Sequence, residues 1–272
     1  MVKSRAVHVA VSYIVLGIFL VLALFPVIYM VLVSFKSFIA IYHPFSVEFY
    51  TRNYIAVFFL RPIGNYLRNT ITASLSSAAL AMIIGMHLAY SASRWGTGGK
   101  NLPFLVLTFR MAPPVVFAIP LFIYLHSLGL LNNVLGLILV YTAMNLPLVV
   151  WVMKSFFDQI PIEFEQAAYI DGCSVTSAFY RVILPMLPSP IIAIFVICVF
   201  FSWIEFLWAL LFTRTPVAET LTVGLSTFYG SAGWQWGQLM AAGVIAVIPL
   251  YIIVLLGRKY LAQGFAWGIA LK

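Results

Sequence analysis

The sequence predicts an all-α membrane protein, built as a bundle of six transmembrane helices. Hydrophobic residues make up 64% of the chain and charged residues 8%, whereas about a quarter of the residues are charged in soluble domains. The mean hydropathy is +1.07. Fifteen basic and seven acidic side chains are too few to cover so much apolar surface in water. Long apolar runs separated by charged segments complete the pattern of a multi-pass protein.

Charged residues mark the ends of the predicted spans, each of which needs about 20 apolar residues to cross a bilayer. Lys3 and Arg5 precede the first apolar run. That run is too long for a signal-peptide core and has no small-residue cleavage site, so we expect an uncleaved span. No internal repeat is evident, which favours one transmembrane domain over residues 1–272. The spans are predicted at residues 9–35, 69–93, 102–126, 134–153, 191–212 and 239–257.

The distribution of Lys and Arg predicts the orientation of the bundle, because cytoplasmic loops retain positive charge. With the N-terminus inside, nine basic residues fall in cytoplasmic segments and five in outer ones. Both termini and residues 158–185 are then cytoplasmic, and residues 36–68 and 213–238 lie outside. The basic residues are scattered between the spans, so the net charge of +8 indicates topology and not a nucleic-acid partner.

Residues 158–185 form the one long polar stretch between two strongly apolar runs, and local signals predict a helix, a tight turn and a second helix. Pro161 suits the first turn of a helix, where its missing N–H would have no partner anyway. Gly172 falls where a left-handed residue ends that helix. Ser174 can cap a second short helix, which Pro185 stops.

The order of residues in this stretch resembles the cytoplasmic EAA coupling loop of permease subunits in ABC importers. The family pattern runs E-A-A, three residues, a glycine and, later, I-x-L-P. The matching segments here are Gln166-Ala167-Ala168, Gly172 and Ile183-Leu184-Pro185. Gln166 departs from the usual Glu, and Glu165 stands beside it. The alternative is an ordinary amphipathic connecting loop in another kind of membrane protein.

Further segments are similar to carbohydrate-type permeases of that family, and together they span most of residues 65–272. The resemblance implies a fold of the type I ABC importer permease kind. It also implies an oligosaccharide, disaccharide or related polyol as substrate, and the cytoplasmic (inner) membrane of a bacterium or archaeon as location. The segments are Asn65-Tyr66-Leu67-Arg68-Asn69-Thr70, Arg110-Met111-Ala112-Pro113-Pro114, Trp203-Ile204-Glu205-Phe206 (Ile204 replacing the usual Asn), and residues 236–242 and 263–268.

The same resemblance implies several partners. They are a second homologous permease subunit, two ATPase subunits, an extracytoplasmic substrate-binding protein and membrane lipid. The chain has no P-loop motif for nucleotide, so we expect ATP and Mg on the partner ATPases, with no cofactor, no metal and no catalysed reaction in this chain. The residues expected to couple to the ATPase are Glu165, Gln166, Ala167, Ala168, Asp171 and Gly172.

Arg110, Asn145, Trp203 and Glu205 are candidates for the substrate pathway. A charge within the membrane is costly and should face protein or water, so Arg110 is either a pathway residue or a tether between helices near Pro113. Asn145 can bond a sugar hydroxyl or join two helices. Glu205, near the outer end of its span, either lines the pathway or meets interfacial water.

Tyr229, Trp234 and Trp236 lie in or beside the predicted outer loop before the last span. Aromatic residues at that depth usually form the belt at the membrane interface. The resemblance implies instead that this loop contacts the substrate-binding protein. Both interpretations stay open at this point.

Two other classes of function compete with an ATP-driven importer. An ion- or proton-coupled secondary transporter usually has repeated halves and acidic residues at mid-membrane. Here no repeat is evident, and Glu205 is the only acid in a predicted span. A purely structural subunit of a membrane complex is the third class.

Overall fold

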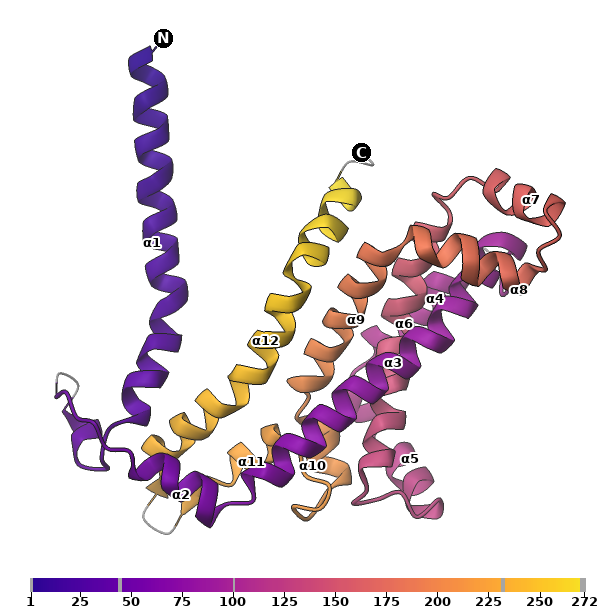
Figure 1. The fold of residues 1–272 in the computed structure, drawn as a ribbon. Helices are drawn as coiled ribbons and strands as arrows, with labels where there is room; N and C mark the ends of the chain where they lie inside the picture. Colours follow the sequence, from indigo (N-terminus) through magenta and orange to yellow (C-terminus); the bar gives the residue numbers. More distant parts are fainter. Residues whose placement is uncertain (1, 44–45, 100, 231–232, 270–272) are drawn as a thin grey trace. The chain divides into compact units, whose positions relative to one another are not determined.

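The structure is a computed structural model that describes residues 2–43, 46–99, 101–230 and 233–269 (Figure 1). The chain divides into two compact units, Met1–Gly64 with Gly224–Ile248 and Asn65–Val223 with Pro249–Lys272. The described residues are predominantly helical, with one short hairpin. In chain order the elements are α1 Val2–Ser34, η1 Ala40–Tyr42, α2 Arg52–Leu60, α3 Ile63–Trp95, α4 Leu102–Met111, α5 Pro114–Ser127, α6 Val134–Phe157, α7 Glu163–Ile170, α8 Val175–Ala178, η2 Phe179–Ile183, η3 Leu184–Met186, α9 Pro188–Trp203, α10 Leu207–Phe212, α11 Leu221–Ser226, β1 Tyr229–Gly230, β2 Gly233–Trp234 and α12 Trp236–Ile269.

Four helices in the described part of the chain are long and apolar enough to cross a membrane. They are Val11–Ser34 within α1, the whole of α3 and α6, and Trp236–Gln263 within α12. A fifth candidate is a bent pair, Val175–Met186 with Pro188–Trp203, whose two arms meet at 84°. The four helices cover the first, second, fourth and sixth predicted spans.

The third predicted span, residues 102–126, is not one continuous helix. α4 and α5 are separated by Ala112 and Pro113, whose ψ angles are 140° and 126°. A residue that precedes proline is driven out of the helical region by the proline ring, and Pro113 and Pro114 follow one another here. The break therefore has a local cause in the sequence.

The fifth predicted span, residues 191–212, is also broken, between α9 and α10. Residues 204–206 leave the helix although none of them is Pro or Gly. Side-chain bonds hold the break open, because Thr222 Oγ1 donates to the Glu205 carbonyl at 2.7 Å and the Trp208 N–H donates to Glu205 Oε1 at 3.2 Å. The count of six spans stays a prediction.

In the first unit, Asn53 ties α2 to the end of α1. Its side chain is buried, and Nδ2 donates to the carbonyls of Ser34 and Lys36 at 2.9 and 2.8 Å. The Ser34 carbonyl belongs to the last turn of α1 and the Lys36 carbonyl follows it, where the backbone has no partner within the helix. At Gly237 a Cβ would lie 2.5 Å from Asn53 Nδ2, so only glycine lets α12 begin this close to α2.

In the second unit, α4 and α9 pack against α6, and α7 and α10 lie toward opposite ends of that arrangement (Figure 1). Two apolar clusters form the interior, one toward α7 and one toward α10. Large aromatic side chains contribute most of the buried area in such cores. The first cluster includes Tyr90, Met153, Phe157, Phe179 and Ile183, and the second includes Leu125, Leu137, Tyr141, Trp208 and Phe212.

Gly85 lets α3 and α6 approach closely. A Cβ there would lie 2.6 Å from Cγ1 of Val149, which is fully buried and cannot turn away. We expect Gly85→Ala to lower stability, because overpacking costs about 1–3 kcal/mol and outweighs the helix-propensity gain of about 1 kcal/mol. Thermal unfolding of the purified protein measures the change. Gly64→Ala, on the same helix with nothing within 4 Å of the new Cβ, is the control. Equal midpoint shifts would contradict the prediction.

Candidate functional site

The polar loop between α6 and α9 folds as the predicted helix, turn and second helix. α7 ends where Gly172 takes a φ of +86°, a left-handed conformation that glycine adopts without steric cost. The N–H groups of Gly172 and Cys173 donate to carbonyls in the last turn of α7 at 3.0 and 2.9 Å, which closes the helix. Ser174 caps α8, since its hydroxyl accepts from the Ser177 N–H at 3.3 Å. Pro185 lies within η3, where the chain turns into α9.

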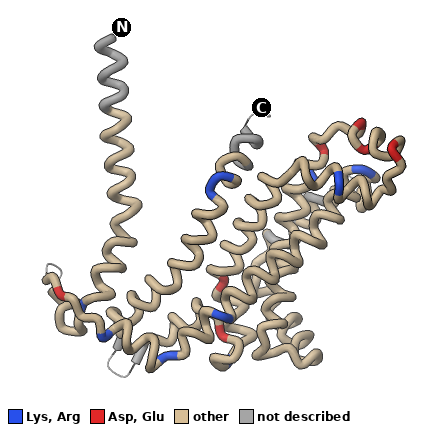
Figure 2. Tube along the Cα trace, in the orientation of Figure 1, with Lys and Arg blue, Asp and Glu red and all other residues tan. Residues whose placement is uncertain are grey.

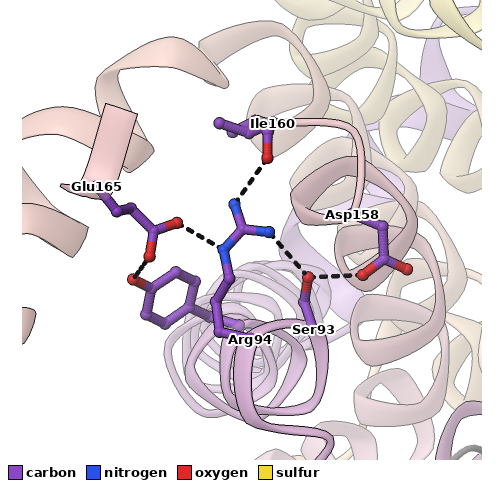
Figure 3. Close-up of polar contacts among 6 residues, drawn as sticks. Ser93, Arg94, Asp158, Ile160 and Glu165 are labelled. Carbon is purple, nitrogen blue, oxygen red and sulfur yellow. Dashed lines mark hydrogen bonds and ion pairs between the residues drawn. The ribbon is translucent and has the colours of Figure 1, made fainter. Parts of the chain in front are cut away.

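A buried ion pair fixes α7 to the end of α3 (Figure 3). Arg94 Nε donates to Glu165 Oε1 at 2.5 Å, and the two side chains are 9% and 2% exposed. The Tyr90 hydroxyl donates to Glu165 Oε2 at 2.7 Å. Arg94 Nη2 also donates to the Ile160 carbonyl at 3.0 Å. Both carboxylate oxygens of Glu165 are therefore bonded within the chain, and this side chain faces the bundle.

Asp158, at the end of α6, extends this network. The Ser93 hydroxyl donates to Asp158 Oδ1 at 2.6 Å, and Arg94 Nη1 donates to that hydroxyl at 3.5 Å. Lys154 Nζ pairs with Asp158 Oδ2 at 2.6 Å. Basic and acidic residues gather at this end of the second unit (Figure 2). The ends of α3 and α6 and the start of α7 are thus held together by a continuous polar chain.

The structure divides the six predicted coupling residues into two groups. The inward group consists of Glu165, 2% exposed, and Ala168, 6% exposed. The other four residues lie on the outward side of the loop, two in the middle of α7 and two in the turn that ends it. They are Gln166, Ala167, Asp171 and Gly172, and all four are exposed.

An exposed apolar set accompanies these four residues on the loop, and sequence reasoning missed it. Ile170, beside the turn, is 87% exposed. Exposed apolar side chains on a polar loop are candidates for a contact surface. The signal was present in the sequence, since bulky apolar residues interrupt an otherwise polar segment. The set consists of Ile162, Phe164, Tyr169, Ile170 and Val175.

Asn145 and Glu205 line one cavity of about 310 Å³ in the second unit. Asn145 is buried on α6, and its Nδ2 donates to Ser202 Oγ at 2.8 Å and to the Cys198 carbonyl at 3.4 Å. It therefore joins α6 to α9, one of the two uses considered for it. Glu205 occupies the break between α9 and α10 and is partly buried. From this break Glu205 contributes to the lining of the cavity.

The other pathway candidates are placed differently. Trp203 is 5% exposed and lies outside the lining of this cavity. The backbone of Arg110 belongs to α4, and its side chain lies outside the described residues. Sequence reasoning missed Tyr141, which lines the cavity with Ser202 and Trp208. The available signal was spacing. Tyr141 is four residues from Asn145, which places the two side chains on one face of a helix.

The predicted binding-protein contacts lie in the first unit. Tyr229 and Trp234 are paired residues of the antiparallel hairpin β1–β2, and their side chains lie outside the described residues. Trp236 begins α12 and is 39% exposed. Arg61 reaches this region, where its guanidinium lies 5.0 Å from the centre of the Phe228 ring.

Apolar helices long enough to cross a membrane, a polar cavity between them and a helix–turn–helix fixed to two helix ends are the features of a transport permease. The chain belongs to the family of binding-protein-dependent transport system inner membrane components, whose family model matches residues 81–267.

Similar proteins agree with this membership. The chain is 34% identical over 258 residues to the trehalose/maltose transport system permease protein MalG of Thermococcus litoralis, across 93% of this chain and 92% of that protein. It is 31% identical over 265 residues to the diacetylchitobiose uptake system permease protein NgcG of Streptomyces coelicolor, across 95% and 88%. A chain in the crystal structure of a bacterial ABC transporter that imports the acidic polysaccharide alginate shares the fold, with a TM-score of 0.77, 24% identity and 94% and 97% coverage.

We expect Glu165→Gln to loosen the loop. Removing one partner of a buried ion pair costs about 3–5 kcal/mol, because the Arg94 guanidinium, 9% exposed, stays buried without its counter-charge. Hydrogen–deuterium exchange of residues 158–185 in the purified protein should rise roughly tenfold or more. Glu163→Gln removes an exposed carboxylate from the same helix and should leave exchange unchanged. If both variants exchanged alike, the buried pair would not be what fixes the loop.

Proposed function

We propose that this chain is the transmembrane permease subunit of an ATP-driven ABC importer that moves a carbohydrate across the cytoplasmic membrane. The supporting observation is the loop between α6 and α9, a helix–turn–helix with an exposed apolar face and a buried ionic attachment. An oligosaccharide, disaccharide or related polyol is the substrate. The relatives' names refer to trehalose/maltose and diacetylchitobiose, which supports this class.

The proposed topology has six spans in a single permease domain, residues 1–272. α1, α3, α6 and α12 each form one span, and the pairs α4 with α5 and α9 with α10 form the two broken ones. Both termini and the loop of residues 158–185 are cytoplasmic, while residues 36–68 and 213–238 are outside. The positive-inside bias of the loops supports this orientation.

The proposed partners are a second homologous permease, two ATPase subunits and an extracytoplasmic substrate-binding protein. ATP and Mg bind to the ATPases, and this chain catalyses no covalent step. Gln166, Ala167, Asp171 and Gly172, with the exposed apolar set of the loop, form the surface that docks on the ATPase. Tyr229, Trp234 and Trp236 contact the binding protein, and Arg110, Asn145, Trp203 and Glu205 belong to the pathway.

Coupling in this proposal is mechanical. When the ATPases close, they displace the docked surface of α7. Glu165 carries that displacement to α3 through Arg94 and Tyr90, and Asp158 links the same network to α6. Because these links are short and the Arg94–Glu165 pair is buried, the loop moves the helices as one body and does not bend away from them.

Gly172→Val should uncouple transport from ATP hydrolysis. A Cβ at Gly172 meets nothing within 4 Å inside this chain, so the substitution acts through the left-handed backbone, at a cost of about 1–2 kcal/mol, and through added bulk on the docking surface. We expect weaker association with the ATPase and a loss of most sugar uptake, with membrane insertion intact. Pull-down of the ATPase and uptake by the reconstituted complex measure both effects.

Gly129→Val is the matched control, because Gly129 also has a positive φ, +67°, and open space around it, but lies between α5 and α6. It should retain ATPase association. Asp171→Ala removes charge without adding bulk and should have a milder effect than Gly172→Val. Wild-type association and uptake in Gly172→Val would mean that the loop is not the coupling element.

Cysteine labelling tests the topology. In a chain with Cys173 and Cys198 replaced by alanine, a membrane-impermeant maleimide added to sealed cells should label Ser46→Cys and spare Ser174→Cys. Permeabilised cells should show labelling at both positions, since both residues are accessible in the folded chain. Labelling of Ser174→Cys in sealed cells would reverse the proposed orientation.

A further inference from the structure

The cavity between α6 and the α9–α10 break contains a buried hydroxyl without a partner. Tyr141 lines the cavity and is 2% exposed. Among the buried side-chain nitrogen and oxygen atoms of the described residues, its hydroxyl alone makes no hydrogen bond. The large majority of buried polar groups are hydrogen-bonded, so an unpaired hydroxyl on a residue that lines a cavity needs a partner that the described side chains do not supply.

Glu205 provides the second observation. One carboxylate oxygen, Oε1, accepts from the Trp208 N–H at 3.2 Å, and Oε2 has no hydrogen-bond partner among the described residues. The ion pairs of the described side chains, Arg94–Glu165 and Lys154–Asp158, do not involve Glu205. Glu205 and Tyr141 line the same cavity. The cavity therefore has a negative charge with an open acceptor and no described cation beside it.

The remaining lining determines what kind of molecule fits. Asn145 uses its Nδ2 on Ser202, which leaves its amide oxygen as an acceptor. Trp208 and Phe201 provide aromatic walls. At about 310 Å³ the cavity is at the small end of ligand pockets, which range from about 300 to 1,000 Å³. That is room for one ring and not for a whole oligosaccharide.

We propose that this cavity is a subsite for one neutral, hydroxyl-rich sugar ring, and that Glu205 selects against anionic sugars. Ring hydroxyls donate to the Glu205 carboxylate and to the Asn145 amide oxygen, and one accepts from Tyr141. The apolar face of the ring packs on the aromatic walls. A carboxylate or sulfonate on the sugar is repelled, because like charges in a low-dielectric site oppose binding. The proposal rests on the proposed import function and assigns a substrate class to this chain.

Isothermal titration of the assembled complex in nanodiscs, without the binding protein, tests the subsite. Maltose, trehalose and diacetylchitobiose serve as neutral probes and digalacturonate as the anionic probe. We expect the wild type to bind at least one neutral probe. Its affinity for digalacturonate should be lower by roughly tenfold or by a larger factor. Tyr141→Phe should weaken neutral binding about threefold to tenfold without lowering the unfolding midpoint of the empty complex, because the lost hydroxyl had no partner there.

Glu205→Gln keeps an oxygen for the Trp208 N–H but removes the charge, so it should reduce the preference for neutral over anionic probes roughly tenfold. Tyr251→Phe makes the same change as Tyr141→Phe at a side chain that is 60% exposed on α12, and should bind like the wild type. The subsite is overturned if no neutral probe binds, if digalacturonate binds as tightly as the neutral probes, or if Tyr141→Phe binds like the wild type.

Stimulated ATP hydrolysis is a separate readout, which distinguishes failure of the subsite proposal from failure of the proposed import function. A sugar-loaded binding protein should stimulate ATP hydrolysis by the wild-type complex. If stimulation occurs while Tyr141→Phe and Glu205→Gln bind all probes like the wild type, the subsite is wrong and the importer stands. If no sugar-loaded binding protein stimulates hydrolysis, the proposed function is wrong, and the subsite proposal that rests on it is withdrawn with it.

Discussion

The Arg94–Glu165 pair is the interaction on which the working geometry of the loop depends. An exposed ion pair contributes at most about 1 kcal/mol, and a buried pair often stabilises a protein no more than apolar residues of similar size. The Arg94–Glu165 pair instead determines where α7 sits against α3, because two charges that are buried away from water must stay together. Tyr90 and the Ile160 carbonyl take up further bonding capacity of the two groups. This fixes the register of α7 against α3 more strictly than apolar packing alone would.

That fixed register determines which side chains the loop presents. α7 has two glutamates in its first turn, Glu163 and Glu165, and two residues along a helix rotate a side chain by about 200°. With Glu165 bound inward, Glu163 must face out, and Gln166, Ala167 and Ile170 follow on the outer surface. A polar anchor on one side of a short helix therefore produces a defined apolar and small-residue surface on the other.

Much of this arrangement could be predicted because charged residues, Pro and Gly act locally. The spans of α1, α3, α6 and α12 follow from apolar runs closed by charge, and the turn at Gly172 follows from the need for a positive φ. The break before α5 also had a local signal in Pro113 and Pro114, although a single span was predicted. The break at Glu205 had none, because it is held by Thr222 and by the Trp208 N–H. The direction of Glu165 depends on Arg94, seventy-one residues away in the chain, and no local pattern encodes that contact.

The loop and the cavity share one helix. α6 runs unbroken over 24 residues, with Tyr141 and Asn145 on the cavity and Asp158 just beyond its end in the ionic network. Asn145 and Asp158 are separated by about 20 Å along the helix axis at 1.5 Å per residue. The cavity residues lie near the middle of α6, and the ionic network lies at its C-terminal end. A displacement of the loop that moves α6 as a rigid body must also move one wall of the cavity relative to Glu205, which is held on the α9–α10 break. In the proposed importer, substrate contact and ATPase contact would be linked through this single helix, without a chain of small side-chain rearrangements between them.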